Sequence, residues 1–321
     1  MVFRNADGSK EGKNDANGDI FVNLATSAIE LNVTNPSTTS FVDNGSPVSF
    51  SASTCGPGDY TLYIDDVIEH SVTNSTSFEY DYLVNQPAGD NINARLEVTD
   101  GTTTSVQSFE IFVRSTVIEA SRPNGILDGI NYDADPTRVT LSLWAPLKSS
   151  VYLLGDFNGW QIDPAYLMKK DGEHFWLELT GLTPAEEYGY QYLVDESIWI
   201  ADPYADKILD PDDQFIAAST YPSLKTYPSG ALHQSSADNR VAIFQTDQEA
   251  YDWQTTDFIK PLREDLIVYE LLIRDYLGEN SANYATLIDT LSYIKGLGVN
   301  ASELMPIMEF NGNDSWGYNP T

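Results

Sequence analysis

Cysteine and histidine are scarce in this chain of 321 residues. Cys55 is the single cysteine, and its solitary position excludes a framework of internal disulfide bonds. The three histidines do not stand at a zinc-site spacing from Cys55. We therefore interpret Cys55 as an ordinary thiol and predict no zinc site. The histidines are His70, His174 and His233.

Basic residues are also few. Lysine and arginine together number 17 against 48 aspartates and glutamates, which gives a net charge of -31. Such a charge repels phosphate backbones and anionic lipid surfaces, so we predict neither nucleic acid nor a charged membrane surface as a partner. A neutral ligand such as a sugar fits this acidity, and so does a merely soluble extracellular protein.

Long apolar runs are missing. No run approaches the ~20 residues that a membrane-spanning helix needs, so no span is predicted. The first ten residues, MVFRNADGSK, lack the hydrophobic core of a signal peptide. Nothing in these residues directs the protein to a compartment.

One short stretch near the start has the alternating acids and amides of a calcium loop. Asp15, Asn17 and Asp19 stand at every second position. A complete loop also needs a downstream bidentate carboxylate, which is missing, so an ordinary polar hairpin is the favoured interpretation. We predict no cofactor from these residues.

The first third of the chain has the pattern of an all-β protein. Residues 1–29 carry Gly and Asn turns around short apolar pieces, and we interpret them as the tail of a preceding β domain. Residues 30–118 form short alternating strands, with hairpin signals at Asp65-Asp66 and Asp100-Gly101. About seven strands in this length predict a β-sandwich similar to the immunoglobulin architecture, without its cysteine pair.

A second all-β unit is predicted over residues 119–223, and it carries a set of motifs. This order of motifs resembles carbohydrate-binding module family 48, a small sandwich that precedes the barrels of isoamylases and branching enzymes. The resemblance implies a β-sandwich here and binding of α-glucan. The motifs are Trp144-Ala-Pro146, Gly155-Asp-Phe-Asn-Gly-Trp160, Tyr190-Gln-Tyr192 and Asp202-Pro-Tyr-Ala205.

An α-glucan site needs flat aromatic faces, because the C–H groups of a pyranose ring pack on a π surface while its hydroxyls bond at the edges. Trp160, Trp176 and Trp199 are the candidates for this carbohydrate-module binding. Tryptophans on the strands of a sandwich also serve as core, and Gln191 stands where glycogen-binding members place a lysine. A sandwich that only supports the next domain therefore stays an alternative.

The pattern changes toward the end of the chain. Residues 224–264 are turn-rich, with few apolar runs, and predict a linker. Residues 265–274 are nearly all apolar and predict a strand buried on both faces. Apolar residues at three- and four-residue steps predict a helix over 284–297, and residues 299–306 predict another strand. This strand, helix and strand demand parallel pairing with a right-handed crossover.

Four motifs in this last part resemble glycoside hydrolase family 13, the α-amylase superfamily. The resemblance implies that residues 265–321 begin a (β/α)8 barrel and stop short of its completion, since a whole barrel takes about 250 residues. The fold class we predict is two β-sandwiches followed by the first βαβ unit of this barrel. The motifs are Val268-Tyr-Glu-Leu271, Leu297-Gly-Val-Asn300, Glu303-Leu-Met-Pro-Ile307 and Asn313-Asp-Ser-Trp-Gly-Tyr-Asn-Pro320.

The family resemblance also implies a substrate-binding set, in which the ring of Tyr318 stacks on the sugar while Trp316 and Asn319 shape the same wall. Glycoside cleavage needs two opposed carboxyl groups. The resemblance places the family's catalytic carboxylates after later strands of the barrel, so Glu303, Glu309 and Asp314 are not expected to be catalytic. No catalytic residue is therefore assigned, and calcium, which is frequent in the family, has no visible ligand set.

We therefore expect the N-terminal part of a secreted, bacterial α-glucan hydrolase of α-amylase type, inactive in this portion alone. Three alternatives stay open at this point. The complete enzyme would be a branching or debranching enzyme of the same superfamily, the protein would bind α-glucan without catalysis, or the sandwiches would be purely structural. The oligomeric state and the bond specificity cannot be read from these residues.

Overall fold

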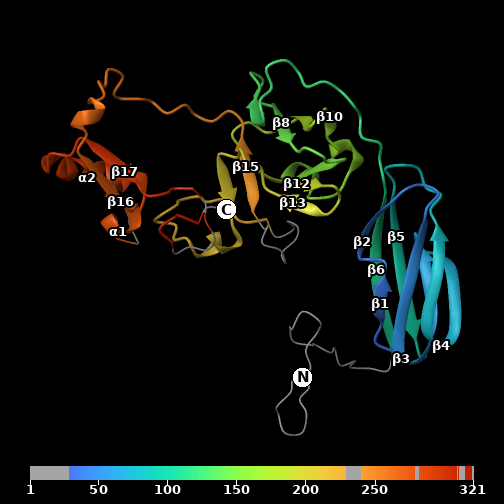
Figure 1. Ribbon diagram of the computed structural model, residues 1–321. Helices are drawn as coiled ribbons and strands as arrows, with labels where there is room; N and C mark the ends of the chain where they lie inside the picture. The colour runs from blue at the N-terminus through green and yellow to red at the C-terminus, as the bar shows by residue number, and fades with distance from the viewer. Residues whose placement is uncertain (1–28, 229–239, 279–281, 309, 311–314, 320–321) are drawn as a thin grey trace, which may run out of the picture. The chain divides into compact units, whose positions relative to one another are not determined.

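The computed structural model describes residues 29–228, 240–278, 282–308, 310 and 315–319 (Figure 1). The chain divides into two compact units, Met1–Thr116 and Val117–Thr321. Almost all of the predicted β tail, residues 1–29, lies outside the described residues, as do Asp15, Asn17 and Asp19. The same holds for His233, Glu309 and Asp314. None of the helices in the described ranges is long and apolar enough to cross a membrane.

The first unit is built from one sheet of six strands. Its strand order is β1-β3-β5-β6-β2, with β4 paired to β3. Every pairing is antiparallel except that of β2 with β6. The strands are β1 (Asn32–Asn35), β2 (Thr39–Val42), β3 (Pro47–Ile64), β4 (Val67–Leu83), β5 (Asn91–Thr99) and β6 (Thr104–Val113).

Both predicted hairpins of this unit are confirmed. Asp65 and Asp66 both have positive φ, as the two central residues of a type I′ turn must, and they join β3 to β4. The second turn joins β5 to β6, where the Asp100 carboxylate accepts hydrogen bonds from the backbone of Thr102 and Thr103 at 2.9 and 2.8 Å. The pairing of β5 with β6 keeps one register from this turn onward, whereas the register of β3 with β4 shifts at three places along the strands.

The long strand β3 changes neighbours along its length. Its first part lies beside β1, with Asn32 opposite Ser53, and its last part lies beside β5, with Asp59 opposite Thr99. Phe50 from the first part meets Phe109 of β6 edge to face, with ring centroids 5.5 Å apart. The sheet therefore closes over a single apolar core. The described strands number six, and the immunoglobulin-like assignment stays a prediction.

The second unit contains three further sheets, and two of them lie in its first part. One has the order β10-β11-β8-β7, and the other has the order β13-β12-β15-β14 with β9 paired to β12. The first is formed by β7 (Gly129–Tyr132), β8 (Arg138–Trp144), β10 (Lys169–Asp171) and β11 (His174–Thr180). The second is formed by β9 (Val151–Gly155), β12 (Glu187–Val194), β13 (Ile198–Ile200), β14 (Lys207–Leu209) and β15 (Val241–Gln245).

The two sheets share one buried core, to which Leu141 and Phe175 contribute from the first and Tyr190, Tyr192 and Phe244 from the second. Strand β12 is central, because β9, β13 and β15 all pair with it. Short 3-10 helices lie in the connections. They are η1 (Asp156–Asn158), η2 (Pro164–Tyr166) and η3 (Pro211–Phe215).

The predicted linker, residues 224–264, is wrong at one point. Val241–Gln245 form β15, which pairs with β12 and β14 and is buried along its first four residues. The predicted boundary at residue 223 therefore comes too early. Four apolar residues among turn-rich neighbours are too short a run to be separated from a linker by composition.

The last part of the chain contains the predicted strand, helix and strand, preceded by η4 (Arg263–Asp265). β16 (Val268–Leu271) pairs in parallel with β17 (Ala301–Leu304), and between them lie α1 (Ile273–Leu277) and α2 (Tyr284–Gly296). The Asn283 side chain caps α2 by accepting a hydrogen bond from the Thr286 backbone at 2.9 Å. Parallel pairing is thus confirmed, and the larger barrel stays a prediction.

The strand predicted over residues 265–274 is not buried on both faces, so this prediction is wrong for the described chain. Of the four residues of β16, only Leu271 is buried, and Val268 is 51% exposed. The reason is that β16 has β17 as its single partner in the described sheet. Leu271, Leu287 and Ile294 make up the buried core of this part.

We expect limited proteolysis to cut the chain after Asp265 before it cuts the sheets on the N-terminal side of that residue. The small core around Leu271 stabilises this part less than the extensive cores of the sheets, so it opens locally at a lower free energy. A time course of fragments identified by mass spectrometry measures the order of cleavage. A fragment from this region that outlasts the sheets would contradict the prediction.

Candidate functional site

The Gly155 to Trp160 motif forms a tight turn after β9. The Asn158 carboxamide accepts a hydrogen bond from the Gly155 backbone at 2.9 Å and donates to the Leu153 carbonyl at 3.1 Å. A Cβ on Gly155 would lie 2.4 Å from the Gly189 carbonyl oxygen, so only glycine fits there. The motif is therefore explained by the backbone geometry of the turn.

Asp156 joins this turn to two other segments. Its carboxylate accepts hydrogen bonds from the Trp160 indole at 2.9 Å and from the Gly189 backbone on β12 at 2.7 Å. The Lys225 ammonium pairs with the same carboxylate at 3.1 Å. Three segments that are distant in the sequence are thus held at one side chain.

Two of the three tryptophans predicted to bind sugar are buried. Trp160 and Trp176 are each 7% exposed. The Trp176 indole donates to the Ala120 carbonyl at 2.8 Å, and the Lys169 ammonium lies 4.6 Å from its ring centroid. Neither ring offers an open face to a sugar, so the predicted stacking surface is wrong for these two residues. Trp199 on β13 is half-buried, and its sugar contact stays a prediction.

An exposed tryptophan of this module was not among the predicted binding residues. Trp144, the last residue of β8, is 52% exposed, and its indole donates to the Glu173 carboxylate at 3.3 Å. This hydrogen bond orients the ring while leaving it accessible. The Trp144-Ala-Pro146 motif drew attention to this position, but periodicity does not tell an inward from an outward residue at a strand end.

A buried carboxylate connects two other motifs of the module. Asp202 is 2% exposed and accepts hydrogen bonds from the hydroxyls of Tyr190 and Tyr192 at 2.8 and 3.0 Å. Its other oxygen accepts from the Tyr204 backbone at 2.8 Å. Burial raises the pKa of Asp202, against the opposing effect of these hydrogen bonds. Burial also raises the pKa of both tyrosines well above their ordinary value.

The three residues predicted as substrate-binding come together near the end of the chain. Trp316, Tyr318 and Asn319 line one open pocket with Arg274 and Ser315. The rings of Trp316 and Tyr318 are both more than half exposed.

Local hydrogen bonds fix this pocket. The Tyr318 hydroxyl donates to the Glu270 carboxylate of β16 at 3.1 Å, and this bond raises the pKa of Tyr318. The Ser315 hydroxyl bonds the Asn319 side chain and accepts from the Gly317 backbone. The arrangement suits a neutral ligand with an apolar face, and its contact with a sugar stays a prediction. Within the described ranges, no three His, Cys, Asp or Glu residues are grouped to hold a metal ion.

One part of the second unit matches a known family of carbohydrate-binding modules. Residues 129–205 match the family described as carbohydrate-binding module 48, the isoamylase N-terminal domain. This segment is therefore similar to carbohydrate-binding module family 48, as its motifs predicted. The match covers β7 to β13 and contains both the Asp156 turn and the Asp202 network.

Curated relatives extend the similarity beyond the module. The chain is 30% identical over 188 residues to a malto-oligosyltrehalose trehalohydrolase from Saccharolobus solfataricus, which covers 58% of this chain and 27% of the relative. It is 28% identical over 191 residues to a 1,4-alpha-glucan branching enzyme from Pseudoalteromonas atlantica, covering 56% and 23%. It is also 28% identical over 204 residues to the chloroplastic isoamylase 1 of Arabidopsis thaliana, covering 62% and 22%.

The resemblance to glycoside hydrolase family 13 is confirmed by these matches. The chain spans about a quarter of the length of these curated relatives. Among solved structures, a pullulanase from Anoxybacillus sp. LM18-11 in complex with maltotriose is similar at 19% identity with a TM-score of 0.42, covering 87% of this chain and 41% of the pullulanase chain.

We expect the Asp202→Asn variant to change how stability depends on pH. The folded-state pKa of Asp202 is raised above its ordinary value of 3.8, so the folded state holds this proton more tightly than the unfolded state does. The stability that Asp202 contributes is therefore fully present below pH 3.8 and is lost as the pH rises through the folded pKa.

The measurement is the free energy of unfolding of the module at a series of pH values, followed by the fluorescence of the buried Trp160 and Trp176. The value for the natural protein minus that for Asp202→Asn should fall as the pH rises above 3.8. Subtraction removes the titration of groups common to both proteins. A difference that grows with pH would show that the pKa of Asp202 is lowered instead.

Proposed function

We propose that this chain is part of an enzyme acting on α-glucans, and that the complete protein hydrolyses them with retention, as α-amylases do. The pocket formed by Trp316, Tyr318 and Asn319 beside the parallel pair β16–β17 carries this proposal. The family 48 module and the relatives named for branching and trehalohydrolase activity support an α-glucan substrate. A branching enzyme is an equally supported alternative, because several relatives bear that name.

In this proposal the open pocket near the chain end contacts substrate. The Tyr318 ring stacks on a sugar while its hydroxyl stays bonded to Glu270, which fixes the plane of the ring. Trp316 adds a second aromatic face, and Asn319 lies on the same wall. The carboxylate of Glu270 therefore has a positioning role, and the pair of carboxyl groups that cleave the bond lies in parts of the enzyme beyond these residues.

The module has a separate role in the proposal. It presents the exposed Trp144 ring, together with the half-buried Trp199, to α-glucan and so keeps the polymer near the enzyme. Its buried tryptophans belong to its core. We further propose that the complete protein is secreted or displayed on the surface of a bacterium, where the negative charge of -31 aids solubility.

We expect the 321-residue protein to release no reducing sugar from soluble starch, because the proposal places no catalytic carboxylate within it. A reducing-end assay on the purified chain, run beside a commercial α-amylase as a positive control, measures this. Starch breakdown that is abolished by changing one acid of this chain, such as Glu303→Gln, would overturn this part of the proposal.

The Trp144→Ala variant should migrate faster than the natural chain in an amylopectin gel. Loss of one aromatic contact should weaken the apparent affinity about two- to tenfold. Trp253→Ala is the matched control, because Trp253 is 72% exposed but lies outside residues 129–205. Equal retardation of both variants and the natural chain would show that Trp144 does not bind the polymer.

A further inference from the structure

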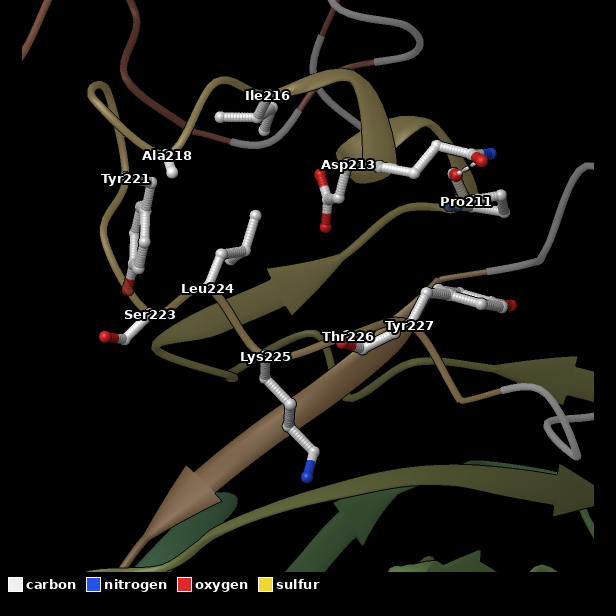
Figure 2. A pocket seen from close by; sticks show the side chains of 11 residues that line it. Pro211, Asp213, Ile216, Ala218, Tyr221, Ser223, Leu224, Lys225, Thr226 and Tyr227 are labelled. Carbon is white, nitrogen blue, oxygen red and sulfur yellow. Dashed lines mark hydrogen bonds between the residues drawn. The ribbon is translucent and has the colours of Figure 1, made fainter.

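A cavity of about 870 Å³ lies in the connection between β14 and β15, and none of the sequence motifs includes it. Figure 2 shows the side chains around it, which all come from residues 211–227. Ligand pockets in proteins are about 300 to 1,000 Å³ in volume. The cavity therefore has the size of a site for a small molecule.

The walls of this cavity are fixed to the sheets by charged side chains. Asp210, the residue before η3, accepts a hydrogen bond from the Asp212 backbone at 2.9 Å and pairs with Arg240 at 3.1 Å. On the opposite wall, Lys225 pairs with Asp156 at 3.1 Å. Both pairs tie this segment to the rest of the module.

One carboxylate within the cavity accepts a hydrogen bond from the protein at only one of its two oxygen atoms. Asp213 is 6% exposed, and its Oδ2 atom accepts a hydrogen bond from the Asp210 backbone at 2.9 Å. Its Oδ1 atom receives no hydrogen bond from the described residues and is not one of the buried polar atoms without a partner, so it is open to solvent in the cavity. Burial raises the pKa of this carboxyl, as expected for a group with few donors. A ligand that donates hydrogen bonds would complete it.

The other walls of the cavity are aromatic and aliphatic. Asp213, Leu224 and Tyr221 surround the same hollow in Figure 2, and Ile216 lies beside them. The Tyr221 side chain is 44% exposed, so part of its ring is open to a ligand. A pyranose ring presents apolar C–H groups on its faces and hydroxyl donors on its rim, which matches this combination.

The nearby cations do not favour an anionic ligand. The ammonium of Lys225 points away from the hollow in Figure 2 and is paired with Asp156. Lys207, which lies 4.8 Å from the Tyr221 ring centroid, is hydrogen-bonded to Glu187 at 2.7 Å. Both ammonium groups are paired with acids, so neither offers an unpaired cation to a phosphate or a carboxylate, and Asp213 adds a carboxylate to the lining.

We propose that this cavity is a second carbohydrate site that binds a short neutral α-gluco-oligosaccharide, with Asp213 accepting hydrogen bonds from sugar hydroxyls and Tyr221 contacting a ring face. The choice of an α-linked glucose chain rests on the proposed function. The site is distinct from Trp144 and from the pocket around Tyr318, and it gives the module a place for a chain end or a short segment.

The test is isothermal titration calorimetry of the 321-residue protein with maltotriose. Tyr221→Ala should weaken binding about tenfold because it removes the contact with a ring face, and Asp213→Asn should weaken it because a neutral amide replaces the stronger carboxylate acceptor. Tyr132→Ala is the matched control, because Tyr132 is 45% exposed in the same module but does not line the cavity. Binding of maltotriose that is the same in all of these proteins would overturn the proposal.

A further variant tests the site independently of Asp213→Asn. Leu224→Trp fills the cavity and leaves residue Asp213 unchanged. It should therefore abolish maltotriose binding even if Asp213→Asn fails to fold. Circular dichroism checks the fold of each variant. Titration with the diamine putrescine tests the alternative of an amine site. If putrescine releases more heat than maltotriose, and if that heat is lost in Asp213→Asn, the cavity is an amine site and the proposal is overturned.

The two proposals can fail separately. If Trp144→Ala loses amylopectin retention while the cavity variants bind maltotriose normally, the proposed function stands and the second site does not. If the cavity variants lose maltotriose but the complete protein neither cleaves nor branches α-glucan, the second site stands and the proposed function does not.

Discussion

The packing of the second unit depends on the central strand β12, whose tyrosine side chains meet a buried carboxylate. Tyr190 and Tyr192 both donate to Asp202, which lies on the chain after β13. An unpaired carboxylate in such a place would be costly, so the hydroxyls and the Tyr204 backbone hold the segment after β13 against β12. The same strand receives the Asp156 turn through the Gly189 backbone. The family 48 motifs are thus largely explained by the interactions that assemble the module.

Several features could be predicted from the sequence because they depend on nearby residues. The turn at Asp65-Asp66 needs two residues with positive φ, and Asp tolerates that conformation. The helix after Asn283 combines a capping side chain with apolar residues at helical steps. Parallel pairing of β16 and β17 follows from the helix between them. The three predicted pocket residues, Trp316, Tyr318 and Asn319, are close in the sequence, so finding them together required no long-range contact.

Other features depend on contacts between distant residues and could not be predicted in this way. β15 is a strand because β12 and β14 supply its partners, while its own apolar run is short. Trp160 and Trp176 look like ligand platforms in the sequence, but Asp156 and Ala120 supply hydrogen bonds that allow both indoles to be buried. Trp144 is exposed because the strand ends there. The cavity around Asp213 depends on pairs such as Lys225 with Asp156, which are far apart in the chain.

The apolar side chains exposed on and around β16 affect the behaviour of the protein in solution. Ile267, Val268 and Ile307 are all more than half exposed, and such surfaces associate when molecules come close. At low ionic strength the charge of -31 keeps the molecules apart. At 1 M salt the Debye length shrinks to about 3 Å, so that repulsion no longer acts between surfaces. We therefore expect higher ionic strength to favour association of this chain through these apolar side chains.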